Sequence, residues 1–225
     1  MNVKVFFKKF KSTIIFSFFF LIIVVPVLFI MLRPKTVLPV YSPADVNPLL
    51  VDESLREVNK DHKIADFKLI NQNGDTITKA DFRNRIYVAD FFFTRCQTIC
   101  PVMAVNMKDL QDHFINDPDI KFLSHSVTPI MDSVPILKAY AKKKGAIDGK
   151  WEITTGDKKH IYELARKSYF AVLDEGDGGD QDFIHTEQFI LIDKKFQIRG
   201  FYDGTDKSEI PRIIRDIDIL RKEYN

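Results

Sequence analysis

The stretch VADFFFTRCQTICPVM, residues 88–103, decides how this chain is organised. Its first half is an apolar run interrupted only by Asp90, which is typical of a central strand covered on both faces. After Pro101, apolar residues recur at helical spacing, so Cys96 and Cys100 lie where a strand passes into a helix. They are the only two cysteines of the chain. This pair can brace the fold, exchange electrons or hold a metal.

The N-terminal part of the chain carries a long apolar run at residues 14–32, IIFSFFFLIIVVPVLFIML. As a helix, these residues would span about 28 Å, close to the hydrocarbon thickness of a bilayer. Four lysines precede the run and only Arg33 and Lys35 follow it closely, so the positive-inside rule places residues 1–13 in the cytoplasm. A cleaved signal peptide is the alternative, but its apolar core is usually about 7–15 residues long and no small-x-small cleavage site follows here. We therefore expect a single-pass anchor in the cytoplasmic membrane, with the rest of the chain in the periplasm or an equivalent compartment.

The part of the chain beyond the anchor is mildly acidic. The chain has a formal net charge of +2, but six of its basic residues lie at or before Lys35 without any acidic residue among them. The remainder holds 27 basic and 31 acidic residues, a net charge of −4. This charge argues against nucleic acid as a partner, because phosphate binding needs a basic face. The prolines of residues 33–60 predict an extended tether, so we assign a single domain to residues 61–225.

Strand and helix patterns alternate along this domain. We expect strands at 86–93, 120–127 and 151–156, hairpins around Asn73-Gly74 and from 188–193 with 196–203, and helices after Pro101, at 132–145, at 157–170 and from about 206. Such alternation predicts a three-layer α/β fold with a central sheet. Ligands of these sheets bind at the carboxyl ends of the strands, which is where Cys96 falls.

The spacing of the cysteines bears on their chemistry. A structural disulfide is disfavoured, because closing a loop of three intervening residues removes little entropy from the unfolded chain. For electron exchange, Pro101 at the first helical position would place Cys100 near the helix cap, where free N–H groups and the dipole favour a thiolate. Cys96, one turn away, would resolve a mixed disulfide. This interpretation describes a copper-independent thiol–disulfide oxidoreductase acting on extracytoplasmic cysteines, so enzymatic activity stays an open alternative.

A metal site needs a third ligand beside the two sulfurs. Two thiolates and one imidazole suit a three-coordinate copper ion, whereas zinc takes a fourth ligand. Among the five histidines, His125 ends a predicted strand and His185 precedes another, directly after the Gly- and Asp-rich residues 174–182. An isolated histidine is more often hydrogen-bonded or solvated than metal-bound. We hypothesise that residues 174–182 form a mobile loop that lets His185 move onto and off the metal.

Three motifs resemble the Sco/SenC family of membrane-anchored copper proteins: FFFTRCQTICPVM, SVTPIMDSVPILKAYAKKKGAIDGKWEITTGDKKHIYELAR and FIHTEQFILID. The likeness runs from about His62 to the C-terminus, and C-x-x-x-C-P is fairly specific, since ordinary thioredoxins have two residues between their cysteines. The resemblance implies a thioredoxin-like fold and copper, as Cu(I) or Cu(II), bound by Cys96, Cys100 and His185. It also implies that the partner is a copper-site subunit of cytochrome c oxidase, whose copper site the protein helps to mature. Thr128 stands where many members have Asp. This difference weakens any claim that depends on that carboxylate and leaves the copper assignment intact.

Three further residues near the cysteines have competing interpretations. Asp90 would either relay a proton to the thiols or, as we favour, hydrogen-bond a neighbouring backbone group. Met103 and Met107 would supply thioethers to Cu(I), but their helical spacing with Leu110 favours packing in the core.

Overall fold

The computed structural model describes residues 10–32, 37–43, 62–172, 176, 178–179 and 181–224. The chain divides into two compact units, residues 1–36 and 37–225. The predictions for residues 1–9, 33–36 and 44–60 lie outside the described residues, as do those for residues 174, 175, 177 and 180 of the expected loop.

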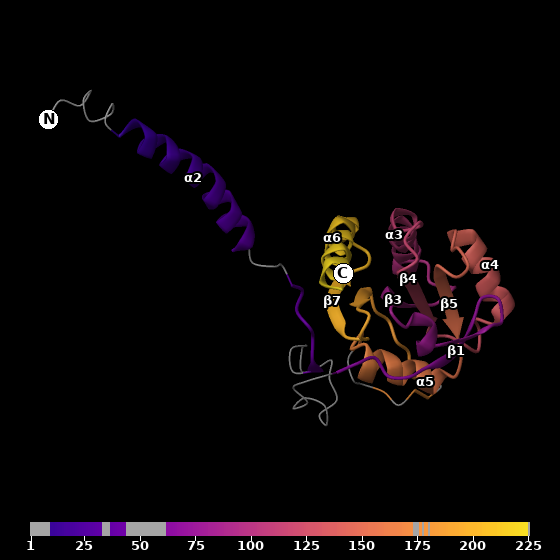
Figure 1. The fold of residues 1–225 in the computed structure, drawn as a ribbon. Helices are drawn as coiled ribbons and strands as arrows, with labels where there is room; N and C mark the ends of the chain where they lie inside the picture. The colour runs from indigo at the N-terminus through magenta and orange to yellow at the C-terminus, as the bar shows by residue number, and fades with distance from the viewer. Residues whose placement is uncertain are drawn as a thin grey trace. The chain divides into compact units, whose positions relative to one another are not determined.

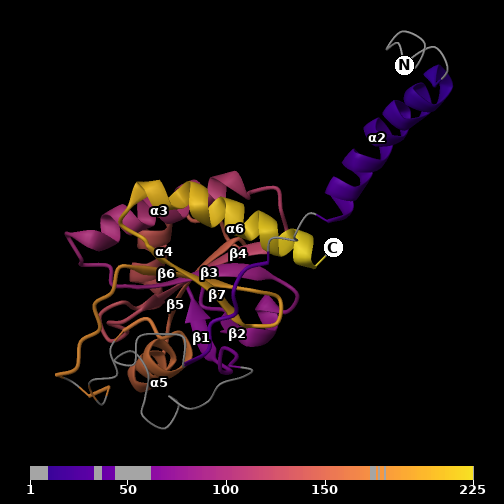
Figure 2. The same ribbon diagram turned by 90° about the vertical axis from the view of Figure 1, so that its left-hand side faces the viewer.

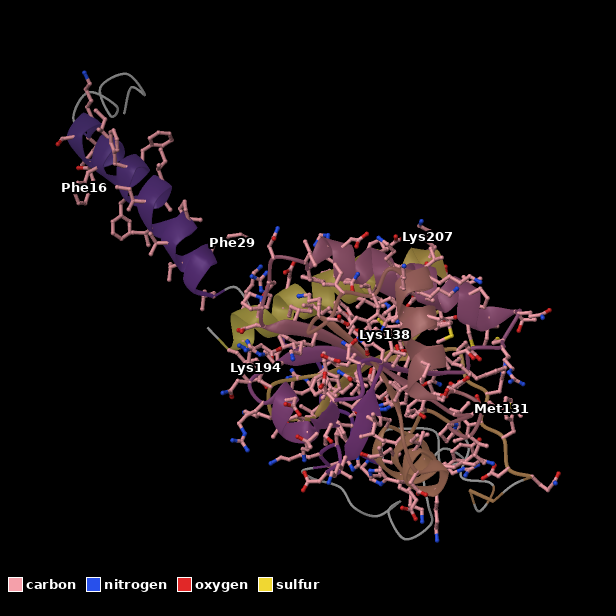
Figure 3. The ribbon with its side chains drawn as sticks, turned by 90° about the vertical axis from the view of Figure 1, so that its right-hand side faces the viewer. Phe16, Phe29, Met131, Lys138, Lys194 and Lys207 are labelled. Carbon is pink, nitrogen blue, oxygen red and sulfur yellow. The ribbon has the colours of Figure 1, made fainter. Side chains whose placement is uncertain are left out.

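The first unit contains helix α2, Lys11–Met31. Its 21 residues span about 30 Å, and the window Lys11–Phe29 is long and apolar enough to cross a membrane. Phe16 and Phe29 project outward from the helix (Figure 3), and none of this window is buried inside the protein. The helix keeps Pro26 in its interior, which a lipid-embedded helix tolerates. The apolar span expected at residues 14–32 is thus a helix that begins three residues earlier.

Within the described residues of the second unit, seven strands form one mixed sheet in the order β2-β1-β5-β4-β3-β6-β7 (Figure 1 and Figure 2). The parallel strands β3, β4 and β5 make its centre, and the other pairings are antiparallel. The bounds are β1 Lys68–Asn71, β2 Thr76–Thr78, β3 Ile86–Phe92, β4 Ile120–Ser126, β5 Trp151–Thr155, β6 Gln188–Ile192 and β7 Ile198–Asp203. All seven residues of β3 are buried, as its apolar composition predicts.

Helices cover both faces of the sheet, which completes the three predicted layers (Figure 2). One face carries α3 (Ile99–His113), α4 (Val134–Lys144) and α6 (Ile210–Glu223), and the other carries α5 (Lys158–Glu163). Because side chains alternate along a strand, Val88 packs in the cluster beneath α3 and α6, while Ala89 packs in the cluster beneath α5. Short 3-10 helices at η4 (Lys79–Phe82) and η6 (Lys207–Glu209) complete the domain.

Two predicted helix positions differ from those observed. Helix α3 begins at Ile99, so Pro101 occupies its third position and Cys100 its second, not the first position and the cap. The helix expected at 157–170 ends at Glu163 and continues as a π-helix, η5 (Leu164–Ser168), in which the N–H of Tyr169 donates to the Leu164 carbonyl. Helix α4 is bounded by the cap residue Ser133 and by Gly145 in the left-handed conformation, within the range 132–145 expected from the sequence.

Residues 37–43 belong to the domain, which corrects the expected tether of residues 33–60. Tyr41 forms a bridge with Ile198 of β7, and its N–H donates to the Ile198 carbonyl at 2.9 Å. The buried Arg199 guanidinium donates to the carbonyls of Leu38 and Pro39 at 2.7 and 3.0 Å. Proline-rich composition predicts an extended chain, and it carries no information about the sheet edge that such a chain pairs with.

Candidate metal and redox centre

Cys96 and Cys100 lie between the end of β3 and the first turn of α3. The Cys100 N–H donates to the Cys96 sulfur at 3.4 Å, and the Thr98 hydroxyl is 3.6 Å from the same sulfur. Both thiols are free; Cys96 is half-buried, whereas Cys100 packs into the core beneath α3. The sequence therefore brings both sulfurs to one helix N-terminus, at the carboxyl end of the central strand.

The two thiols differ in acidity. Partial burial acts to raise the pKa of Cys96, but hydrogen bonds from Cys100 and Thr98 outweigh it and lower the pKa to about 7. Burial raises the pKa of Cys100 to about 12, and the nearby charges of Cys96 and Asp90 add to this rise. The expectation that Cys100 supplies the thiolate is wrong, because Cys100 lies inside the helix while its N–H group points at Cys96. Cys96 is the thiol that ionises near neutral pH.

A buried carboxylate, Asp132, holds the loop that carries Cys96. It accepts hydrogen bonds from the hydroxyls of Thr94, Ser126 and Thr128 at 2.5, 2.6 and 2.9 Å. The Thr94 N–H adds a fourth bond at 3.2 Å, and Asp132 itself is fully buried. The sequence placed Asp132 only at the start of the helix expected at 132–145, so this role was missed. The four donors converge because the three residues that carry them, Thr94, Ser126 and Thr128, lie where the neighbouring strands β3 and β4 end.

Asp90 is also buried, beneath the thiols. Burial raises its pKa to about 7, against a hydrogen bond from the Ser124 hydroxyl. Ser124 in turn accepts from the Trp151 indole N–H at 2.8 Å. The favoured interpretation, a hydrogen bond to a backbone group, is therefore corrected: the partner is a side chain on the neighbouring strand β4. Met103 and Met107 are fully buried in the core, as their spacing predicts.

His125 cannot join the thiols. It is fully buried on β4, and its ring packs against Phe91 and Tyr169 on the face of the sheet beneath α5. Cys100 packs on the opposite face, beneath α3. Burial lowers the pKa of His125 to about 3, so its ring is neutral, and Nδ1 pairs with the Thr154 hydroxyl at 3.1 Å. Its place at a strand end indicated proximity to the thiols, but the side to which it points depends on the strand register.

His185 is exposed on the extended segment that leads into β6. This segment is held at both ends. Asp182 accepts two hydrogen bonds from Arg166, both at 2.7 Å, and the Thr186 hydroxyl donates to the Ala171 carbonyl at 2.8 Å. The described end of the expected mobile loop is therefore anchored by an ion pair that is almost fully buried.

The segment of His185 contacts the cysteine loop through two aromatic rings. The ring of Phe183 meets the ring of Phe93 edge-on, with centroids 5.2 Å apart. The backbone carbonyl of Phe93 accepts a hydrogen bond from the Cys96 N–H at 3.3 Å. Burial alternates along residues 183–187, so Phe183 and His185 lie on one side of an extended chain. Among the described residues, no three His, Cys, Asp or Glu side chains are gathered closely enough to hold a metal ion. The structure thus brings the two sulfurs together and leaves His185 on a neighbouring segment.

Comparison with known proteins places the chain in a family. A family model described as SCO1/SenC matches residues 56–220. The chain belongs to the SCO1/SenC family. The SCO1 protein homolog of Bacillus subtilis (strain 168) is 31% identical to it over 158 residues, which are 69% of this chain and 81% of that relative.

Solved structures of Sco proteins share the fold. BsSco, a member of the Sco family of cytochrome c oxidase assembly proteins in which a disulfide switch has been identified, matches at 30% identity with a TM-score of 0.61, over 71% of this chain and 94% of that one. ScoI of Bradyrhizobium japonicum, solved with copper bound, matches at 21% identity with a TM-score of 0.55, over 72% of this chain and 99% of that one. The predicted family and the thioredoxin-like fold are confirmed.

Proposed function

We propose that this Sco protein binds one copper ion through the sulfurs of Cys96 and Cys100 and the imidazole of His185. The observation that carries the proposal is the pair of free thiols at one helix N-terminus, with the Cys100 N–H 3.4 Å from the Cys96 sulfur. Two soft sulfurs and an imidazole are ligands that copper accepts in either oxidation state. The copper found in the ScoI structure supports the choice of metal.

We further propose that the protein delivers this copper to a copper-site subunit of a respiratory oxidase. Cys96 is the partly exposed sulfur, so it is the ligand that a client cysteine reaches first, while Cys100 keeps the ion attached from within the core. His185 completes the site when its segment moves toward the cysteine loop, which it already contacts through Phe183. The client is proposed from the family, since BsSco belongs to the cytochrome c oxidase assembly proteins.

The same two sulfurs form a disulfide when they are oxidised, and a disulfide no longer binds the metal. Metal transfer and disulfide reduction are therefore two uses of one pair, governed by its oxidation state. The disulfide switch of BsSco supports this link.

Copper titration of the reduced, detergent-solubilised chain tests the proposal. One equivalent of copper should bind, and His185→Ala should lower the affinity by at least tenfold, because even the loss of a group that only orients a ligand costs about 10–100-fold. His113→Ala, which removes an exposed histidine at the far end of α3, is the matched control and should bind like the wild type. Equal affinities for all three proteins would exclude His185 as a ligand.

A copper-independent thiol–disulfide oxidoreductase is the second candidate, favoured by the separation between the pKa values of Cys96 and Cys100. It predicts weak copper binding that does not respond to His185→Ala, together with multiple turnovers of a disulfide substrate. The titration and a turnover assay on the same preparation distinguish the two functions.

We also propose that α2 anchors the protein in the cytoplasmic membrane with the domain outside the cytoplasm. A membrane-impermeant maleimide added to intact cells should label Cys96 after mild reduction. Labelling only after the cells are opened would reverse the orientation.

A further inference from the structure

A cavity of about 350 Å³ opens beside the cysteine loop. Its apolar wall comes from two sides: Phe93 precedes the cysteines, and Phe183 belongs to the segment of His185. Val127, the turn at residues 128–131 and Tyr162 also line the cavity. This volume is at the small end of ligand cavities, which suits one or two side chains better than a cofactor.

Large apolar side chains stand exposed at the rim of this cavity. Ile130 is 83% exposed, Phe183 53% and Met131 49%. Figure 3 shows Met131 projecting from the edge of the domain, far from Lys194 in the β6–β7 turn. Apolar residues gathered around a hollow, rather than scattered singly, mark an interaction surface.

Hydrogen bonds hold the turn that presents Ile130 and Met131. The N–H groups of Met131 and Asp132 both donate to the Thr128 carbonyl at 2.9 Å. The buried Asp132 carboxylate then ties this turn to Thr94 and Ser126. A partner that docks here therefore meets a surface that is already ordered, which lowers the entropic cost of binding.

The charge at the mouth of the cavity is positive. Arg95 is exposed and, among the described residues, has no hydrogen bond or ion pair. Lys158 lines the same cavity and donates to the Asp182 carbonyl at 2.8 Å. The Asp182 carboxylate is already neutralised by Arg166. A carboxylate on the partner would complement Arg95.

We propose that this cavity docks an extended segment of the client protein, in which a bulky apolar side chain and an Asp or Glu flank the cysteine presented to Cys96. The inference rests on the proposed function, because it assumes that a client cysteine meets Cys96. Arg95 is the neighbour of Cys96 in the chain, and residues of an extended segment lie about 3.3 Å apart. Residues one or two positions from the client cysteine therefore reach the cavity while its sulfur is at Cys96.

Thiol exchange with synthetic peptides tests this docking on the full-length, reduced protein in detergent. Each probe is a symmetrical peptide with Leu-Glu before and Glu-Leu after one cysteine, and that cysteine is joined by a disulfide to thionitrobenzoate. The Cys96 thiolate attacks the peptide sulfur, a new S–S bond forms, and the old one breaks. The leaving thionitrobenzoate anion takes the electron pair and is measured by its colour.

Two matched peptides separate the apolar contact from the charge. Replacing both Leu by Ala should slow exchange by about tenfold, the scale of a lost apolar contact in a pocket. Replacing both Glu by Gln should slow it by about threefold at low salt and less at high salt. Hydroxyethyl disulfide, which is small and neutral, measures the basal reactivity of Cys96.

Protein variants then locate the preferences. Ile130→Ser with Phe183→Ser should remove the Leu preference, and Arg95→Gln should remove the Glu preference. Ile115→Ser, which removes an exposed apolar side chain beyond the far end of α3, and Arg83→Gln, which removes an exposed cation, should keep both. Rates divided by the hydroxyethyl disulfide rate correct for any change in the thiol itself.

Peptide preferences that persist in the cavity variants, or equal rates for all peptides, would overturn the proposal. A preference that vanishes in nanodiscs would assign the cavity to lipid, and one that weakens as the protein concentration rises would assign it to a second copy of the chain. Failure of hydroxyethyl disulfide to react would instead count against the thiol chemistry of the proposed function.

Discussion

Cys96 and Cys100 are different thiols although they lie one helical turn apart. The Cys96 sulfur accepts the Cys100 N–H, while the Cys100 sulfur is in the core. Thiolates, not thiols, are alkylated, so reactivity rises as the pH passes the pKa. In Cys100→Ser, iodoacetamide should modify Cys96 at a rate that rises through about pH 7. In Cys96→Ser, Cys100 should stay slow and rise only toward strongly alkaline pH. Matching profiles would contradict the assignment of Cys96 as the nucleophile.

Asp90 makes the free energy of unfolding depend on pH, and its raised pKa sets the direction of that dependence. Its folded-state pKa is about 7, above the ordinary value of 3.8, so between these values the folded protein holds a proton that the unfolded chain has lost. The free energy of unfolding should therefore fall as the pH rises from about 4 to 7, by up to about 4 kcal/mol from this group. Urea unfolding at several pH values should show a shallower fall in Asp90→Asn. Asp75→Asn, at an exposed turn, should keep the wild-type slope.

At the scale of the element, an ion pair holds the N-terminal end of the segment of His185. Arg166 lies on the π-helix η5 and forms a bidentate ion pair with Asp182. The side chains of Arg166 and Asp182 are 6% and 8% exposed. Asp182→Asn leaves the guanidinium without its counter-charge, which should cost about 3 kcal/mol and free the following residues. Hydrogen exchange of the amides of residues 184–187 should become faster. Lys194→Ala, which breaks a more exposed pair with Asp119, is the control and should leave their exchange unchanged.

The same measurement tests the hypothesis that His185 moves onto the metal. Copper should slow hydrogen exchange in residues 181–187 of the wild type, because a bound imidazole holds its segment. The same exchange rates with and without copper would contradict that hypothesis.

At the scale of the whole domain, Arg199 joins three distant parts of the chain. Its guanidinium binds Asp193 at 2.8 Å and Glu223 of α6 at 2.7 Å, in addition to the carbonyls of Leu38 and Pro39. Arg199→Met should cost about 3–5 kcal/mol, because two carboxylates lose their counter-charge. It should also expose residues 37–43 to limited proteolysis at a protease concentration that spares the wild type. Arg215→Met removes a largely exposed arginine of α6 and should change neither result. Resistance of Arg199→Met to proteolysis would show that the bridge at Tyr41 suffices.

The sequence alone determined the order of the elements, the apolar helix at the N-terminus and the position of both thiols at the end of a buried strand. These features depend on local periodicity, which follows directly from the geometry of a strand or a helix. The motifs and their spacing also predicted the family, and the family model confirms that prediction. The copper ligands Cys96, Cys100 and His185 stay a prediction, with two of the three side by side.

Only the tertiary structure decided which thiol ionises, that His125 faces away from the thiols, and that Asp132 organises their loop. It also decided that residues 37–43 pack on β7 and that Arg166 holds the segment of His185. Each of these results depends on burial and on partners that are distant in the sequence, such as Arg199 and Leu38. A pKa or an ion pair depends on what surrounds a group in space, and local pattern does not encode those surroundings.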